Sequence, residues 1–390
     1  MVPEGWKLCP LGALVSFANG KAHEKDISED GKYILVNSKF ISTEGRVYKR
    51  SHEAFCPARS HDVLMVMSDV PNGRAIAKCF YVMEDGKYTV NQRIARLRAD
   101  KVDSKFLFYA INRNSYYLRF DDGITQTNLR KDEVLECPVR TPPLPEQKKI
   151  AQILSTWDQA ITATERLLEN SQQRKKGLMQ QLLTGKKRLL GFEGEWESLR
   201  LRDLLKEEKA RNKELSIMRV LSVTNHSGFV LPEEQFSKRV ASDNVSNYRI
   251  VRKGQYGYNP SRLNVGSFAR LDTYDEGLLS PMYVVFSVNE ARLNNDYFLN
   301  WMKSNEAKQR IAGSTQGSVR DSVGFDALCN FPFRLPPLDE QQKIADVLVK
   351  AEREVDALKE RVFFLKQEKK ALMQQLLTGK RRVKVDSEAA

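Results

Sequence analysis

Apolar residues in two stretches of the chain recur at alternating steps of four and three residues. One series runs from Ile150 to Leu182 and the other from Ile344 to Leu376. This 3.5-residue spacing is typical of a coiled-coil seam and persists for about five heptads in each stretch. Polar residues interrupt the seams at Thr164, Ser171, Lys175 and Lys369. We therefore expect the pairing to favour a fixed register over maximal stability.

The two stretches belong to one motif that is written twice. It begins as PPLPEQKKIAQIL at Pro142 and as PPLDEQQKIADVL at Pro336, and both copies contain LMQQLLTGK before they close at Arg188 and Arg382. The starts and the ends are both 194 residues apart, so the copies have equal length. An internal repeat of this kind should control the interpretation of the fold.

Each copy carries the signals of one long helix. Pro-Pro presets an extended start, Glu146 and Glu340 lie near the positive end of the helix dipole, and Gly185 and Gly379 mark the ends. The first helix ends where the large segment 189–335 begins, and the second helix starts where that segment ends. We therefore expect the two helices to pair in an antiparallel way, over about 55 Å at 1.5 Å per residue. Two separately buried helices are the weaker alternative, because each helix has only one narrow apolar face.

The sequence predicts an α+β protein with two mixed α/β domains separated by a long antiparallel two-helix coiled coil, related by a pseudo-twofold repeat. The predicted parts are a first domain at 1–141, a first helix at 142–188, a second domain at 189–335, and a second helix with a tail at 336–390. In the first domain we expect strands at Tyr33–Asn37, Asp62–Met67 and Tyr88–Arg98 and a helix at Phe106–Tyr117. In the second we expect strands at Val220–Val223, Tyr256–Asn259 and Met282–Phe286 and a helix at Tyr297–Ile311.

The charge of the chain indicates the class of its partner. Among 390 residues, 63 Lys and Arg face 50 Asp and Glu, which gives a net charge of +13. Nucleic acid or an acidic membrane surface is the expected partner class. The chain has no run of 18 apolar residues and no signal-peptide pattern, so we expect a cytoplasmic protein that does not enter membranes. The five cysteines form no CxxC pair and are expected to be reduced thiols.

The motifs of an enzyme are mostly absent. TGKK after Leu183 ends like a P-loop but lacks the glycine-rich cradle, and Tyr258 to Ser261 lacks the second proline of a base-flipping NPPY loop. His52, Cys56 and His61 lack a fourth zinc ligand nearby. We therefore predict no catalytic residue, no bound cofactor and no metal in this chain.

The remaining polar chemistry suits DNA. Arg can bind guanine and Asn or Gln adenine in a bidentate way, whereas Lys, Ser and Thr more often hold phosphates. Taken singly, each such residue is more often a solvated surface group, but the loops GITQ at Gly123 and GSTQ at Gly313 occur in corresponding places. The candidate DNA-binding residues of the first domain are Lys39, Arg46, Lys49, Arg50, Arg74, Gln92, Arg93, Thr125, Gln126, Asn128 and Arg130. Those of the second are Lys238, Arg239, Arg262, Asn264, Thr315, Gln316, Ser318 and Arg320.

The order of these parts resembles the specificity subunit of type I restriction-modification systems. The resemblance rests on two variable units, each followed by a PPLxEQxxIAxxL helix that ends in LMQQLLTGK, and it covers essentially the whole chain. It implies two target-recognition domains, each reading half of a bipartite, asymmetric site in double-stranded DNA. It also implies docking of two modification subunits, which bind S-adenosylmethionine and methylate adenine N6, and of restriction subunits that cleave unmodified DNA. The specificity subunit of that family does no chemistry itself.

Two other functions are less consistent with the sequence. A basic coiled-coil scaffold would bind partner proteins and nucleic acid without reading sequence, and a nuclease or methyltransferase acting alone would need the cofactor loops that the chain lacks. If the coiled coil acts as a ruler, matched heptad insertions in both helices should lengthen the gap between the half-sites. Exchange of the second domain should change one half-site only.

Overall fold

The computed structural model describes residues 2–71, 73–235, 244–315 and 322–385. The chain divides into two units: unit 1 comprises Met1–Glu165 and Glu360–Ala390, and unit 2 comprises Arg166–Lys359. Two helices of 39 residues each, α5 (Leu144–Leu182) and α10 (Leu338–Leu376), run through this division. Each unit therefore contains a part of each long helix.

Unit 1 is built on a four-stranded antiparallel sheet in the order β2-β9-β5-β7 and a three-stranded sheet in the order β4-β3-β8, in which β3 and β8 run parallel. Two short antiparallel pairs, β1-β11 and β6-β10, complete it. The strands are β1 (Lys7–Pro10), β2 (Val15–Asn19), β3 (Tyr33–Val36), β4 (Lys49–Ser51), β5 (Val63–Val66), β6 (Ser68–Asp69), β7 (Cys79–Tyr81), β8 (Tyr88–Val90), β9 (Ile94–Ala99), β10 (Thr127–Asn128) and β11 (Pro138–Thr141). The short helices are η1 (Leu11–Ala13), α1 (Ser38–Ser42), α2 (Ser104–Ile111), α3 (Ser115–Leu118) and α4 (Lys131–Leu135).

Unit 2 repeats the four-stranded sheet and the strand pair at the start of the long helix, and it has the antiparallel pairs β14-β15 and β16-β19 in place of the three-stranded sheet. Its four-stranded sheet has the order β13-β20-β17-β18, so in both units the first strand along the chain pairs with the last, and the last with the second. The strands are β12 (Glu197–Arg200), β13 (Leu205–Glu207), β14 (Ser222–Thr224), β15 (Gly228–Val230), β16 (Arg249–Arg252), β17 (Tyr256–Tyr258), β18 (Phe268–Arg270), β19 (Glu276–Leu279), β20 (Val284–Val288) and β21 (Pro332–Leu335). The helices are η2 (Leu201–Asp203), α6 (Pro232–Gln235), η3 (Pro260–Arg262), α7 (Asn295–Met302), α8 (Asn305–Thr315) and α9 (Phe325–Cys329).

The core of each unit includes residues of the long helices. In unit 1, Ile150 and Leu154 of α5 are fully buried against strands β5 and β9 and helix α2 in one apolar cluster. In unit 2, Ile344 and Leu348 of α10 occupy the corresponding place, beside a group of aromatic rings centred on Phe286. Burial of these leucine and isoleucine side chains stabilises each helix end by about 2 kcal/mol per residue.

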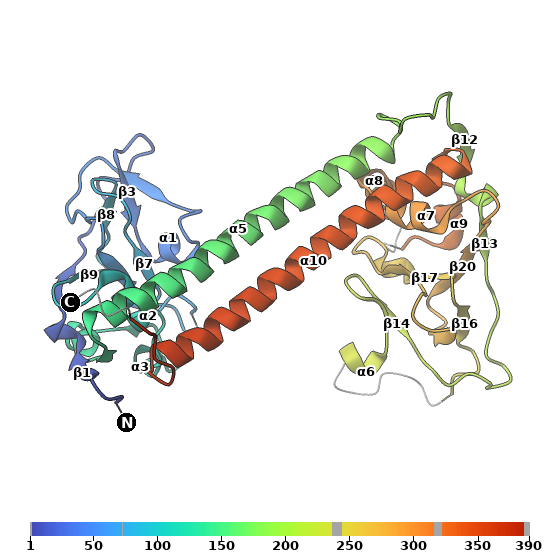
Figure 1. The fold of residues 1–390 in the computed structure, drawn as a ribbon. Coiled ribbons are helices and arrows are strands. Elements are labelled where there is room, and N and C mark those ends of the chain that lie inside the picture. The colour runs from blue at the N-terminus through green and yellow to red at the C-terminus, as the bar shows by residue number, and fades with distance from the viewer. Residues whose placement is uncertain (1, 72, 236–243, 316–321, 386–390) are drawn as a thin grey trace. The chain divides into compact units, whose positions relative to one another are not determined.

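The two long helices pair in opposite directions, as predicted. In unit 1, Asp158 of α5 is paired with Lys369 near the end of α10. In unit 2, Lys175 near the end of α5 is paired with Glu352 in the first half of α10. Within each unit the two helices lie side by side, α5 in green and α10 in orange-red (Figure 1).

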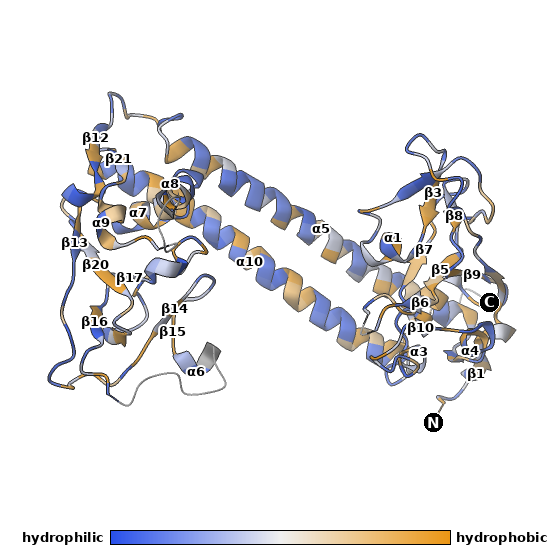
Figure 2. Ribbon diagram, turned by 180° about the vertical axis from the view of Figure 1, so that it is seen from behind, coloured by the Kyte–Doolittle hydropathy of each residue, from blue (hydrophilic) through white to orange (hydrophobic). Residues whose placement is uncertain are grey.

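The predicted seam is confirmed at all twenty positions, because each of them is buried or half-buried. The polar seam residues are accommodated in specific ways. The hydroxyl of Thr164 donates to the Ala160 carbonyl at 2.7 Å, and Ser171 donates to Glu354 at 2.9 Å. The outer faces of both helices are mainly hydrophilic (Figure 2).

Most predicted short elements are present, with three corrections. The strand expected at Tyr88–Arg98 is two strands, because a turn at residues 91–93 passes the chain from one sheet to the other. The helix expected at Phe106–Tyr117 is divided into α2 and α3 at Arg113, whose φ of 55° leaves the helical region. The helix expected at Tyr297–Ile311 is divided into α7 and α8, where Ser304 accepts a bond from the Ala307 amide at 3.2 Å.

The expected correspondence of the two TQ loops is wrong at the level of conformation. Gly123 lies in a loop with a φ of 70°, whereas Gly313 lies inside α8. Both segments nevertheless have similar places along the chain. Gly123 comes shortly after α3, the second helix after β9, and Gly313 lies in α8, the second helix after β20.

Among the described residues, no helix combines the length and apolar character needed to cross a bilayer. The five cysteines are free thiols, and burial raises the pKa of Cys329 to about 11.

Candidate nucleic-acid interface

Backbone hydrogen bonds gather four segments of unit 1 at one end of its sheets. The Asn91 amide donates to the Val36 carbonyl, the Met67 amide to Arg93, and the Leu129 amide to Met67, at 3.0, 3.0 and 2.8 Å. These bonds place residues 36–39, 67–69, 91–93 and 126–129 next to one another. Three predicted DNA-binding segments, far apart in the sequence, therefore share one edge with residues 67–69, which the sequence analysis did not select.

Exposed amide and cationic side chains occupy this edge. Gln126 donates to the Ser68 hydroxyl at 2.8 Å, and Asn128 lies opposite Ser68 in the β6-β10 pair. Gln92 donates to Glu24 at 3.2 Å. Lys39 and Arg93 are also exposed. We name Lys39, Gln92, Arg93, Gln126 and Asn128 the unit 1 edge; it combines two groups that can bind phosphate or guanine with three that can bind adenine.

Sequence reasoning missed the residue that shapes the neighbouring loop. The Asp69 carboxylate accepts the backbone amides of Val70, Ala75 and Ile76 at 2.9, 2.6 and 3.0 Å. A side chain at Gly73 would collide with this carboxylate, so glycine is required there. The loop thereby presents Arg74 to solvent.

The fold already engages most of the other predicted residues of unit 1. Arg46 donates to the Thr43 carbonyl at 3.1 Å, Thr125 to Asp122 at 2.9 Å, and Arg130 is paired with Glu133 at 3.0 Å. The Arg50 guanidinium donates at 3.2 Å to the carbonyl of Gly31, which precedes β3, so it points away from α1. Lys49 is exposed on β4. These residues are not part of the unit 1 edge.

Unit 2 presents a different edge. The loop between β17 and β18 carries Arg262 and Asn264, both exposed. The tip of the β14-β15 hairpin lies against this loop, because the Ser267 hydroxyl donates to the Val223 carbonyl at 2.9 Å. Asn225 and His226 at the hairpin tip are exposed beside it, and sequence reasoning did not select them. The available signal was the short Asn-His-Ser-Gly turn between two apolar strands.

Several predicted residues of unit 2 cannot be placed. Lys238, Arg239, Gln316, Ser318 and Arg320 lie outside the described residues, as does the side chain of Thr315 at the end of α8. They stay predictions.

The glutamates at the two helix starts do more than face a helix dipole. In unit 1, buried Glu146 accepts the Trp6 indole N–H at 3.1 Å and the Arg382 guanidinium at 2.7 and 2.8 Å. In unit 2, Glu340 accepts Trp196 at 3.0 Å and Arg188 twice at 2.7 Å. Hydrogen bonding to the carboxylates raises the pKa of both arginines. We call each Trp–Glu–Arg group a clasp.

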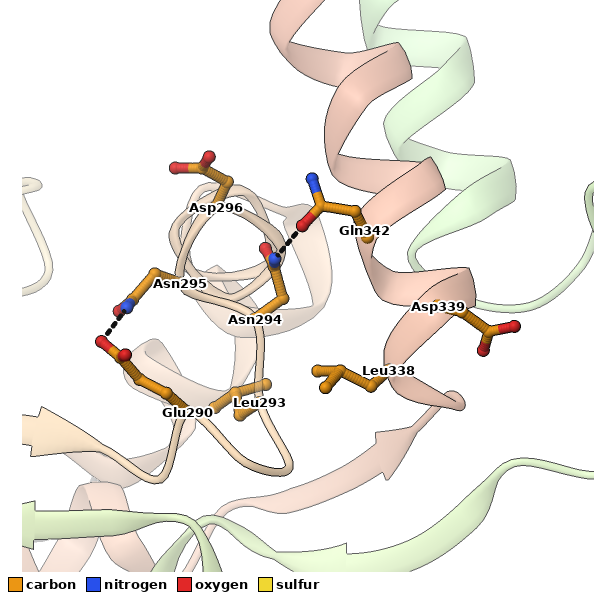
Figure 3. Close-up of a pocket in the computed structure, with 8 residues that line it drawn as sticks. All are labelled: Glu290, Leu293, Asn294, Asn295, Asp296, Leu338, Asp339 and Gln342. Atoms are coloured by element: carbon orange, nitrogen blue, oxygen red, sulfur yellow. Dashed lines mark hydrogen bonds between the residues drawn. The ribbon is translucent and has the colours of Figure 1, made fainter.

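The glutamine after each clasp glutamate anchors the helix start to its own unit. Gln147 accepts the Asp103 amide at 2.7 Å, and Gln341 accepts the Asn294 amide at 2.8 Å. In unit 2 a pocket of about 740 Å³ lies beside this anchor. Figure 3 shows Asn294 reaching Gln342 of α10 on one wall of that pocket. The repeated Glu-Gln pair thus has a structural explanation in both copies.

Comparisons with known proteins agree with this architecture. A family model described as the type I restriction modification DNA specificity domain matches residues 3–170 and 238–362. The MjaVIII specificity subunit of Methanocaldococcus jannaschii, a type I restriction enzyme subunit, is 21% identical over 411 residues, covering 98% of this chain and 94% of the relative.

Two solved structures share the fold. The S subunit of a type I restriction-modification system from M. genitalium has a TM-score of 0.61 at 14% identity, with 96% of each chain covered. A chain from a study of assembly and conformational transition of a type I R-M system has a TM-score of 0.55 at 18% identity, with 98% of this chain and all of that chain covered. With two repeats of one scaffold and a family model that matches most of its length, this chain belongs to the type I restriction-modification DNA specificity family and serves as a DNA sequence-specificity subunit.

Proposed function

We propose that each unit of this chain reads one half of a bipartite, asymmetric site in double-stranded DNA. The observation that carries the proposal is that one scaffold is built twice with two different edges. After the first strand of its four-stranded sheet, unit 1 continues into β3 and helix α1. At the same point, unit 2 continues into the β14-β15 hairpin. Different side chains on equivalent scaffolds suit two unlike half-sites. The excess of basic residues supports binding to the phosphate backbone.

The proposal extends to the partners of the chain. The helix pair sets the gap between the half-sites and docks two adenine-N6 methyltransferase subunits, which supply S-adenosylmethionine, and restriction subunits join to cleave unmodified DNA. The chain itself performs no chemistry, binds no cofactor and works in the cytoplasm. The functional parts are the target-recognition domains 1–141 and 189–335 and the helices 142–188 and 336–390. A scaffold that ignores DNA sequence is not favoured, because the family to which the chain belongs is one of DNA specificity.

Methylation mapping tests this proposal directly. The full chain would be co-expressed with the methyltransferase subunit, and methylated adenines would be sequenced. Replacing Arg93 and Gln126 by Ala in unit 1 should relax base preference in one half of the site only. Replacing Arg262 and Asn264 by Ala in unit 2 should relax the other half only. Each lost bidentate contact is expected to reduce discrimination by about tenfold to a hundredfold.

The repeat supplies matched controls. Arg140 on β11 and Arg334 on β21 are equivalent exposed arginines away from both edges. Their replacement by Ala should leave the methylated sequence unchanged. Methylation without a defined sequence in the wild type would contradict the proposal, and so would a unit 1 variant that changes both halves.

A further inference from the structure

Two neighbouring aromatic side chains lie exposed on α10 in unit 1. Phe363 and Phe364 are 57% and 59% exposed, and their rings touch edge to face at 5.7 Å between centroids. Val362 and Leu365 belong to the seam that faces α5, so the two phenylalanines lie on the outer side of the helix. Exposed apolar groups that form a patch mark surfaces at which a partner binds.

The first helix copy lacks this patch. The positions of α5 that correspond to Phe363 and Phe364 hold Glu169 and Asn170. The repeated scaffold therefore folds without aromatic residues here. A partner that binds both helix copies in the same way does not explain them either, because only one copy carries them.

Four exposed polar side chains surround Phe364 on the same side of α10, two of them one turn before it and two one turn after it. The four are Glu360, Arg361, Gln367 and Glu368. In the part of the chain that the structure describes, no hydrogen bond or ion pair engages them. The neighbouring Lys366, by contrast, is paired with Glu165 of α5 at 2.7 Å. We call Phe363, Phe364 and these four residues the α10 outer face.

The order of these residues is self-complementary about Phe364. Arg361 and Glu368 lie on one flank of the face, seven residues apart, and carry opposite charges. Glu360 and Gln367 lie on the other flank with the same separation. When two copies of this helix lie antiparallel with their Phe364 rings at a twofold axis, residues on the same flank meet. Position 361 of each copy then meets position 368 of the other, which is the reciprocity that a twofold interface requires.

We propose that the α10 outer face binds the same face of a second copy of this chain. The two Phe364 rings pack against each other at the twofold axis, and each is supported at its edge by Phe363. Arg361 of each copy pairs with Glu368 of the other copy. This inference goes beyond the reading of DNA and does not depend on it.

Other kinds of partner fit the α10 outer face less well. The carboxylates of Glu360 and Glu368 repel phosphate, which argues against a nucleic-acid backbone and against an acidic membrane surface. In a pair of identical helices, by contrast, Gln367 of one copy donates to Glu360 of the other. An unrelated protein would need no symmetry in the order of these residues, so the symmetry favours a second copy.

Sedimentation velocity of the full chain measures this association. The α10 outer face is small, because a single helix supplies it, whereas stable interfaces bury about 800 Å² on each partner. We therefore expect a Kd on the order of 10 µM. From about tenfold below to tenfold above this concentration, the sedimentation coefficient should rise from that of a monomer to that of a dimer.

Two charge reversals test whether the contact is twofold. Arg361→Glu brings carboxylates together at both ion pairs, and Glu368→Arg brings guanidinium groups together. Each variant alone should associate at least about tenfold more weakly than the wild type. An equimolar mixture of the two variants should associate like the wild type, because each ion pair then joins opposite charges again. The chain that carries both changes should also recover.

An uncharged variant and a control complete the series. Phe363→Ala with Phe364→Ala removes the apolar centre and should weaken association at least about tenfold without changing any charge. Arg166→Glu with Glu169→Arg reverses two exposed charges at the corresponding level of α5 and should leave association unchanged. Unfolding midpoints show whether each variant is folded.

Four results would overturn the inference. They are a wild-type chain that stays monomeric, an association that none of these variants weakens, a mixture of the two charge variants that does not associate, and an association lost in the α5 control. If the wild type is monomeric and the aromatic variant loses a methyltransferase subunit, the α10 outer face belongs to that subunit instead. None of these results bears on the proposed reading of DNA, which methylation mapping tests separately.

Discussion

The two units agree where the helix ends enter them and differ where their sheets meet solvent. Strand pairs β1-β11 and β12-β21 have the same register, and the clasps use the same three residue types. Beyond the sheets, unit 1 carries α1 and the β6-β10 pair, whereas unit 2 carries the β14-β15 hairpin. We call the two long helices, these strand pairs and the clasps the frame. Contacts at the helix ends are the same in both units and hold the frame, which leaves the outer loops free to differ.

The clasps explain why the frame needs two copies. Glu146 at the start of the first copy binds Arg382 at the end of the second, and Glu340 binds Arg188 in the reverse sense. A single copy therefore cannot satisfy its own glutamate. Since both ends are joined in this way, the antiparallel register is defined at two places, independently of the seam.

The largest expected effect comes from breaking one clasp. Glu340→Ala removes the carboxylate that holds Arg188 and the Trp196 indole, and both donors lose a buried partner. Because breaking a buried ion pair leaves an uncompensated charge, we expect a loss of about 3 kcal/mol in the free energy of unfolding. Denaturant unfolding measures this loss, and faster hydrogen exchange around Trp196 should locate it.

The equivalent change in unit 1 sharpens the comparison. The Arg382 side chain is 46% exposed, against 23% for Arg188, so water can replace more of its lost contact. Glu146→Ala should therefore cost less, about 2 kcal/mol. Equal losses would show that exposure of the arginine does not govern the strength of the clasp, and Glu→Gln at either site should cost less than Ala because an acceptor remains.

An intermediate effect is expected from reversing the ion pairs of the seam. Lys175–Glu352 and Lys369–Asp158 are equivalent in the repeat, but only Asp158 also accepts the Tyr109 hydroxyl, at 2.7 Å. Lys175→Glu should cost about 1 kcal/mol, and Lys175→Glu with Glu352→Lys should recover most of it.

The same double reversal in unit 1 should fail to recover stability. Lysine at position 158 cannot accept the Tyr109 hydroxyl that Asp158 accepts in the wild type. Double-mutant cycles of the free energy of unfolding measure both cases. Full recovery in unit 1 would mean that the tyrosine bond contributes nothing.

The sequence predicted the frame well because its signals are local or periodic. The seam from Ile150 to Leu182 is a spacing pattern, and the equal lengths of the copies predict helices of equal length. The large segment between the two copies predicts that the helices run antiparallel. The clasps were not predicted, because Glu146 and Arg382 are far apart in sequence and each alone resembles an ordinary helix-terminal charge. Only the folded chain shows that the repeat joins one copy to the other.

The candidate DNA edges were predicted in part. Polar loop residues such as Gln92 and Gln126 can be selected by chemical type, but their gathering depends on backbone bonds between distant segments. Arg50 and Arg130 were selected by the same chemistry but lie outside the unit 1 edge, bonded to the Gly31 carbonyl and the Glu133 carboxylate. Residue type alone does not distinguish these two situations.

The smallest effect is expected from moving the chain ends. In unit 2, Arg188 and Trp196 of one clasp are joined by the segment 189–195, and Arg188 also bonds the Gly194 carbonyl. In unit 1, Arg382 bonds the Glu4 carbonyl at 2.9 Å, although no short segment joins Arg382 to Trp6. A permuted chain that joins Arg382 to Trp6 through a copy of residues 189–195, and opens after Gly191, should keep both clasps. We expect its free energy of unfolding to change by less than about 1 kcal/mol, since the closed and opened loops have equal length.

The methylated sequence of the permuted chain should stay the same, because neither edge is altered. A loss of several kcal/mol, or a changed half-site, would show that the two clasps are not equivalent and that the repeat is a likeness of sequence without interchangeable parts.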